Sequence, residues 1–196
     1  MSFARQYDHL GSKEIGQRAL RAVQNAPPSG DTDKQYEQQR IQLIEFFSAV
    51  DLSSYPALTA CALSVYGWMP TIPKNLLEYS NVAGLQRELM ELQAGSLDKP
   101  TEFNFVNGSV VGTSKFLHFL RPDRFAIWDV NVAAGIAFQD TDRSEIGKPA
   151  FSSVNCVTRY TTYLEGLRSV TDDALELRDL EFALFRLGRQ LLRKTR

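Results

Sequence analysis

The sequence of 196 residues is long enough for one large domain or two small lobes. Hydrophobic residues make up 43% of it, which is ample for a packed core. The formal net charge is −1, so the chain is not a generally basic protein. Any binding to nucleic acid must therefore depend on a local cluster of cations.

The chain has only two cysteines, Cys61 and Cys156, and they lie far apart in the sequence. This pattern favours free thiols over a disulfide and suits a reducing compartment, so we expect a cytoplasmic protein. The cysteines form no metal-binding motif and the two histidines add little, so we expect no zinc, iron–sulfur cluster or other cofactor. The sequence contains no run typical of a signal peptide and no apolar stretch long enough to span a membrane.

Hydrophobic periodicity and capping residues predict a series of helices separated by loops rich in proline and glycine. Before the central stretch we expect weak structure over 1–10 and a short turn or strand at 103–106. The helices expected in this part cover residues 12–25, about 32 to 50, 56–66, 74–79 and 82–93. The loop at Trp68, Met69 and Pro70 is a candidate wall of a groove, with simple packing as the alternative.

After the central stretch, a polar loop over 139–148 precedes two long predicted helices, over 149–170 and 174–193. No clear alternation typical of strands is present, so the sequence predicts an all-α fold. We expect a single helical domain, with residues 30–106 as one lobe. The N-terminal helix and residues 107–196 would form the other.

The stretch from Asn107 to Phe138 predicts a turn, a helix, a short loop and a second helix. The first helix is expected to begin at Thr113 or Ser114, which can cap its free amides, and to end at Arg121 before Pro122. Lys115 then lies in the first helical turn, with His118 on the same side. Asp129 is the expected N-cap of the second helix.

Lys115 and Asp129 are the candidate catalytic residues. Unpaired amides and the positive end of a helix dipole disfavour an ammonium group, which favours the neutral, nucleophilic amine of Lys115. The Asp129 carboxylate can stabilise a developing cation on a substrate or move protons. The two roles are compatible if the site holds these side chains apart and directs both at the substrate.

Two segments of this stretch carry a family resemblance: Gly112-Thr113-Ser114-Lys115 and the hexapeptide Ile127 to Val132. Together they resemble the helix-hairpin-helix DNA glycosylases, especially the branch that includes 8-oxoguanine DNA glycosylase. The resemblance implies a two-lobed helical fold that acts on damaged or abasic duplex DNA. It also implies that Lys115 attacks the sugar C1′ to form a Schiff base and that Asp129 supports cleavage of the glycosidic bond.

Further residues are candidates for binding DNA, and each has a structural alternative. The hairpin residues Gly112, Thr113 and Ser114 and the cations Arg121 and Arg124 would contact phosphates, or the arginines are solvated loop residues. His118 and Trp128 would line a base pocket, or His118 is structural and Trp128, like Phe125, belongs to the core. Equally, Lys115 is open to interpretation as a solvated lysine, and Asp129 as a helix cap alone. Three arginines form a row at helical spacing on the last predicted helix, most simply a solvated face: Arg186, Arg189 and Arg193.

Two functions follow from these observations. The first is a DNA glycosylase-like enzyme of base excision repair with abasic-site lyase activity through Lys115. The second is a non-catalytic helical module of the same fold that binds DNA or a protein partner. The second is favoured by the near-neutral charge and by the segment Asn107 to Gly112, which replaces the Leu-Pro-Gly-Val-Gly hairpin usual in the family.

Overall fold

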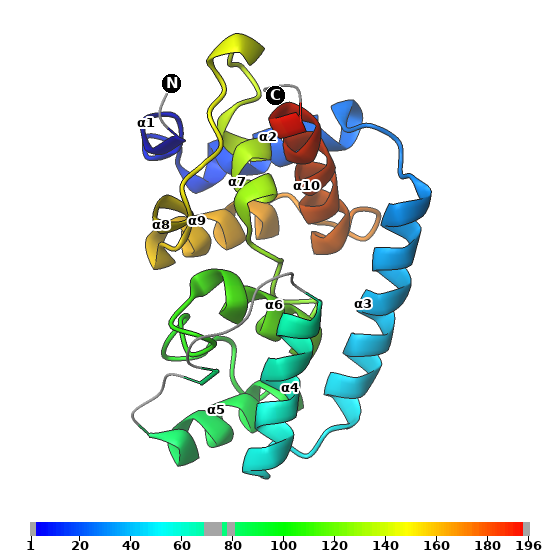
Figure 1. Cartoon of the computed structure of the whole chain (residues 1–196), viewed down its shortest axis with the longest axis vertical. Coiled ribbons are helices and arrows are strands. Elements are labelled where there is room, and N and C mark those ends of the chain that lie inside the picture. Colours follow the sequence, from blue (N-terminus) through cyan, green and yellow to red (C-terminus); the bar gives the residue numbers. More distant parts are fainter. Residues whose placement is uncertain (1–2, 69–75, 78–80, 194–196) are drawn as a thin grey trace. The chain divides into compact units, whose positions relative to one another are not determined.

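The computed structural model describes residues 3–68, 76–77 and 81–193, and every regular element in these ranges is a helix (Figure 1). Extended pairing is limited there to two isolated bridges, between Leu77 and Val106 and between Asp172 and Leu175. The all-α prediction is therefore confirmed. None of the helices described combines the length and the apolar composition needed to cross a bilayer.

The chain folds into two compact units. Unit 1 consists of Met1–Ser29 together with Ala126–Arg196, and unit 2 consists of Gly30–Phe125. This division differs from the predicted boundary at residue 106, because the turn and first helix of the central stretch belong with the middle of the chain. The second helix of that stretch belongs to unit 1.

Unit 2 is built around one helix and a cluster of aromatic rings. Its helices are α3 (Asp31–Ala49), α4 (Tyr55–Gly67), α5 (Val82–Ala94) and α6 (Val110–Leu120). Phe116 of α6 contacts Phe47 of α3 and Phe105, with ring centroids 4.9 and 5.3 Å apart. These rings are fully buried, and such edge-to-face contacts add to the stability gained from their burial.

Unit 1 brings together the two ends of the chain. Its elements are α1 (Phe3–Tyr7), α2 (Ser12–Asn25), α7 (Val130–Ala137), the short 3-10 helix η1 (Arg143–Glu145), α8 (Phe151–Val154), α9 (Val157–Arg168) and α10 (Leu177–Arg193). Figure 1 shows α7 beside α10, and the two helices are in extensive contact. Their backbones approach closely at glycines: a Cβ atom added to Gly188 would lie 1.8 Å from the carbonyl oxygen of Asn131.

Several predicted boundaries are confirmed and others are wrong. The helix over 12–25 is found as predicted. Residues 1–10 contain α1, because Phe3 and Tyr7 are buried by rings from distant segments. The single helix expected over 149–170 is broken at Asn155 and Cys156, and the last helix begins at Leu177 instead of residue 174. Most of the predicted helix over 74–79, and Met69 and Pro70 of the groove wall, lie outside the described residues.

Candidate functional site

The central stretch begins with a tight turn at Asn107 and Gly108. Both residues have positive φ, 54° and 58°, and the amide of Ser109 donates to the carbonyl of Val106 at 3.0 Å. Asparagine and glycine adopt this left-handed backbone more readily than other residues do. The predicted turn is therefore confirmed.

Helix α6 begins at Val110, three or four residues before the predicted start. The turn places Ser109 at the N-cap, where its hydroxyl accepts from the Gly112 amide at 3.3 Å. Lys115 is consequently the sixth residue of the helix and lies in its second turn, so the expected first-turn position is wrong. Its side chain is only 6% exposed, which also excludes the interpretation as a solvated lysine.

The three residues expected to present the hairpin to DNA are buried inside unit 2. Thr113 accepts a hydrogen bond from the Val106 amide at 3.0 Å, and the Ser114 hydroxyl donates to the carbonyl of Val111 at 3.0 Å. A Cβ atom on Gly112 would lie 3.0 Å from the Tyr66 hydroxyl. Thr113 thus links α6 to the segment before the turn, the Ser114 hydroxyl is used within the helix, and none of the three residues forms an exposed surface.

His118, a candidate for the base pocket, is fully buried and holds the end of α6. Its Nδ1 lies 2.7 Å from the carbonyl oxygen of Phe125, which requires an N–H at that nitrogen. Its Nε2 can then accept from Arg40, whose Nη1 is 3.2 Å away. The structural interpretation of His118 accounts for both ring nitrogens.

The two arginines expected to bind phosphate take part in ion pairs with neighbouring acids. Arg121 pairs with Asp123 at 2.7 Å and donates to the carbonyl of Leu92 at 2.8 Å. The hydrogen bond from Arg121 lowers the pKa of Asp123 below its usual range. Arg124 pairs with Asp98. Both cations therefore tie the loop after α6 to the segment around the end of α5.

In unit 1, Asp129 caps α7 as predicted. Its Oδ1 accepts from the amides of Asn131 and Val132 at 2.8 and 2.9 Å, and the side chain remains half-buried. Trp128 is fully buried, and its indole N–H donates to the carbonyl of Val154 at 2.8 Å. A ring held in this way packs the core and presents no face for stacking on a base, so the pocket role expected for Trp128 is not supported.

Two tyrosines position the backbone that leads to Asp129, a role that sequence reasoning missed. The hydroxyl of Tyr160 donates to the carbonyl of Ala126 at 3.3 Å, and that of Tyr163 donates to the carbonyl of Ile127 at 3.1 Å. Burial raises the pKa of both phenols above the ordinary value, so they remain donors. Their three-residue spacing indicated that both side chains lie on one face of α9. The sequence could not identify their hydrogen-bond partners, which lie more than thirty residues away in the chain.

The two candidate catalytic residues belong to different units: Lys115 is buried in unit 2, and Asp129 is half-buried and caps a helix in unit 1. An amine and a carboxylate are the groups needed for imine formation and for stabilising a sugar cation. Within the part of the chain that the structure describes, no three potential metal ligands lie together. Comparisons of the chain with protein-family models, with curated proteins and with solved structures found no match.

Proposed function

We propose that this protein is a DNA glycosylase-like enzyme that forms a Schiff base with damaged or abasic DNA through Lys115. The observation that carries the proposal is the burial of Lys115, at 6% exposure, on a helix whose residues are all buried. Lysine is rarely buried to this extent, because transfer out of water costs its ammonium form free energy. The neutral form of a lysine amine is the form that attacks a sugar.

Asp129 is the second residue of the proposed chemistry. Its carboxylate is fixed by two amide donors at the start of α7, and the backbone before it is fixed by Tyr160 and Tyr163. A rigid, partly exposed carboxylate can stabilise positive charge on the sugar as the glycosidic bond breaks. The order of turn, lysine helix, loop and aspartate helix also agrees with the resemblance to the helix-hairpin-helix glycosylases.

The chemistry is simplest on an abasic site. The Nζ atom of Lys115 attacks C1′ of the open-chain aldehyde, a C–N bond forms, and the former carbonyl oxygen leaves as water. The product is an imine, which borohydride reduces by hydride transfer to a stable secondary amine. On a damaged nucleotide the departing base takes the place of water, and that nucleotide must first leave the base stack.

Borohydride trapping on a duplex with one abasic site tests the lysine. The parent protein should give a covalent adduct, and Lys115→Gln should give none while remaining folded by circular dichroism. Lys99→Gln is the matched control, because Lys99 is an exposed lysine of the same unit. An adduct that persists in Lys115→Gln, or that is absent from the folded parent on abasic and oxidised-guanine duplexes, would contradict the lyase proposal.

The structure also favours a second candidate, a non-catalytic module that binds DNA or a protein partner. The supporting observation is that Gly112, Thr113 and Ser114 are buried while Arg121 and Arg124 pair with acids, so the expected contacts serve the fold. This candidate predicts DNA affinity that falls with salt but does not change in Lys115→Ala, and no release of a damaged base. Base release that depends on Lys115 or Asp129 would exclude it.

A further inference from the structure

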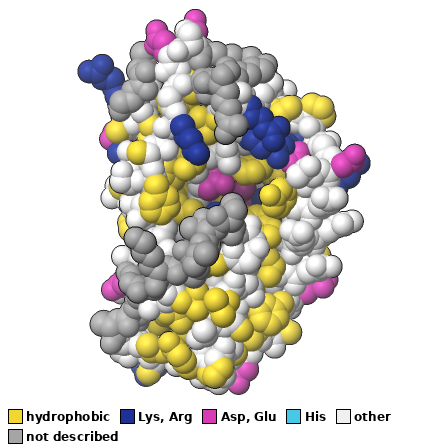
Figure 2. All heavy atoms as spheres, viewed as in Figure 1, with side chains coloured by type: hydrophobic (Ala, Val, Ile, Leu, Met, Phe, Trp, Pro, Cys, Tyr) yellow, Lys and Arg dark blue, Asp and Glu magenta, His cyan; other side chains and the backbone are white. Residues whose placement is uncertain are grey.

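A cavity of about 550 Å³ lies in unit 1 beside the C-terminal half of α10. It is lined by the start of α7, by the loop before α8 and by α10, through residues that include Asn131, Ile146, Lys148, Arg189, Leu192 and Arg193. Among its described lining residues there are three cations and one amide, and none is acidic. In the space-filling view, Lys and Arg side chains gather over α10 (Figure 2).

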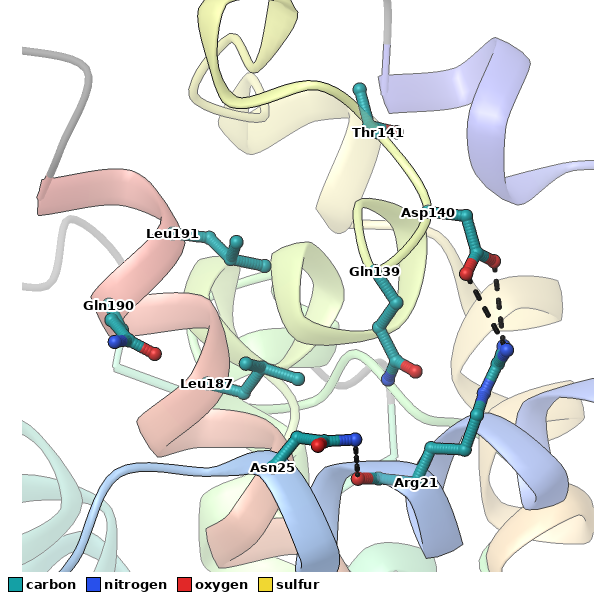
Figure 3. Close-up of a pocket in the computed structure, with 8 residues that line it drawn as sticks. All are labelled: Arg21, Asn25, Gln139, Asp140, Thr141, Leu187, Gln190 and Leu191. Carbon is teal, nitrogen blue, oxygen red and sulfur yellow. Dashed lines mark hydrogen bonds and ion pairs between the residues drawn. The ribbon is translucent and has the colours of Figure 1, made fainter.

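A second cavity beside α10, in the same unit, has a lining in which positive and negative charges balance. It has a volume of about 340 Å³, and its one arginine, Arg21, reaches both oxygens of Asp140 at 3.5 Å (Figure 3). The amide of Gln139 is also used, because it donates to the carbonyls of Arg18 and Gly135 at 2.8 Å. The described lining of this cavity carries no net charge, whereas three cations line the larger cavity.

The fold holds the cationic lining in place. Arg189 and Arg193 are four residues apart and therefore lie on one face of α10. The guanidinium of Arg189 lies 5.3 Å from the centroid of the Phe185 ring, a cation–π contact that restrains it. The close approach of Gly188 to Asn131 fixes α10 against the first turn of α7. Asn131 and Arg189 are thus set beside each other by backbone packing.

The arginine row predicted on the last helix is divided by these contacts. Arg186 turns away to donate to the carbonyl of Pro27 at 2.7 Å and lies 5.1 Å from the centroid of the Phe182 ring. Arg189 and Arg193 line the cavity together with Lys148, an exposed residue of the loop before α8. The row is therefore not a uniform solvated face, and two of its members converge with a lysine from another segment.

We propose that this cavity binds a phosphate group, carried either by a nucleic-acid backbone or by a free phosphorylated compound. Guanidinium groups match phosphate oxygens with paired N–H donors, and Lys148 and Asn131 supply a further charge and an amide. Ile146 and Leu192 offer apolar contact to the part of the ligand that bears the phosphate. The inference is independent of the Schiff-base proposal, because Lys115 does not line the cavity.

The test compares two double variants with the same change in charge. Lys148→Gln with Arg193→Gln removes two cations from the cavity, and Arg5→Gln with Lys13→Gln removes two exposed cations elsewhere in unit 1. The probes are inorganic pyrophosphate, followed by calorimetry, and a short fluorescein-labelled duplex, followed by anisotropy at several salt concentrations. All four altered residues are exposed, so both variants should fold with the parent's melting temperature.

We expect the cavity variant to lose about tenfold or more in affinity and the control to lose much less. If the duplex is the ligand, the slope of log affinity against log salt should fall by about 2 in the cavity variant. If pyrophosphate affinity falls while duplex affinity does not, the ligand is a free phosphorylated compound. Equal losses in the two variants, or a parent that binds neither probe at low salt, would overturn the proposal.

Arg189→Lys gives a finer measurement at the same cavity. The substitution keeps the positive charge but removes the paired N–H donors, so affinity for the bound probe should fall several-fold if the guanidinium grips phosphate oxygens. Unchanged affinity in this variant, together with equal losses in the two double variants, would show that only bulk charge attracts the probes.

Discussion

The two units of this protein reach a packed interior by different means. In unit 1, helices meet backbone to backbone at glycines, with Gly135 against Leu184, Gly188 against Asn131, and Gly16 against Gly166. In unit 2, α6 is enclosed by aromatic rings and carries buried polar side chains, which include Lys115 and His118. The comparison indicates that unit 1 depends on the absence of side chains at its helix crossings. Unit 2 depends instead on satisfying polar groups within its core.

Replacing a crossing glycine in unit 1 should have the largest effect. In Gly188→Ala the new methyl group would overlap the Asn131 carbonyl, and backbone cannot move aside as a flexible side chain can. We expect a loss of about 3 kcal/mol or more in the free energy of unfolding. Urea titration measures this, and a Trp68→Phe background leaves Trp128 as the fluorescent reporter of unit 1.

Gly67→Ala is the control for that prediction. Nothing lies within 4 Å of a Cβ atom at Gly67, so its free energy of unfolding should change by less than about 1 kcal/mol. If Gly188→Ala unfolds at the same urea concentration as Gly67→Ala, α7 and α10 do not cross as closely as described.

A buried polar group of unit 2 gives the next largest effect. His118→Leu keeps most of the side-chain volume but removes the hydrogen bonds to the Phe125 carbonyl and to Arg40. We expect unfolding to become easier by about 2 kcal/mol, because these polar groups lose a partner inside the protein. Lys99→Gln, at an exposed position of the same unit, should leave the unfolding midpoint unchanged. A His118→Leu protein as stable as the parent would show that the imidazole contacts contribute no stability.

The features that the sequence could predict are those that residues near in the chain determine. The helix over 12–25 and the Asp129 cap depend on local periodicity and capping, and both were predicted correctly. Helix α1 is too short for a periodic signal, and Phe3 and Tyr7 are buried only by contacts with distant residues. The apolar periodicity continues on both sides of the break at Asn155. Periodicity alone therefore predicted one helix where the structure has two, α8 and α9.

For the candidate site, the prediction failed mainly in which side chains are buried, and less in where the helices lie along the chain. The side of α6 with Lys115 and His118 was predicted to lie away from the buried stripe, where a helix usually faces solvent. Other parts of the chain cover that face, so every residue of α6 is buried. The useful local signal was Ser109 after the Asn-Gly turn, which sets the start of the helix and places Lys115 in its second turn.

Two substitutions of Asp129 distinguish its role as the cap of α7 from a role in the chemistry. Asp129→Ala removes an acceptor used by two amides, and loss of such a cap costs about 0.5–2 kcal/mol. Asp129→Asn should retain most of the stability, because asparagine caps about as well, but it removes the charge. Under the proposed function, Asp129→Asn should be folded and inactive in base release. A stable and fully active Asp129→Asn protein would leave Asp129 as a cap alone.

The smallest expected effect comes from exposed ion pairs, one in each unit. In unit 1, Arg159 pairs with Asp8 at 2.7 Å across a long sequence separation, and its hydrogen bond lowers the pKa of that carboxyl. In unit 2, Arg121 and Asp123 are near neighbours in the chain. A carboxyl with a lowered pKa contributes stability above its unfolded value of about 4, and the contribution is lost as the pH falls through the folded value. Asp8 is about half exposed, so screening limits this contribution to less than about 1 kcal/mol.

The comparison of the two pairs makes this small effect measurable. Asp8→Asn should shift the unfolding of unit 1 slightly at pH 7 and by less at about pH 3, below the unfolded pKa of the carboxyl, where its contribution is being lost. Asp123→Asn should shift unit 2 by a comparably small amount, because the Asp123 carboxylate is also more than half exposed and is screened by solvent. Urea titrations at the two pH values, with Trp128 reporting unit 1 and Trp68 reporting unit 2, provide the measurement. A shift in Asp8→Asn that is equally large at both pH values would mean that the contact acts through packing and not through the charge of the carboxylate.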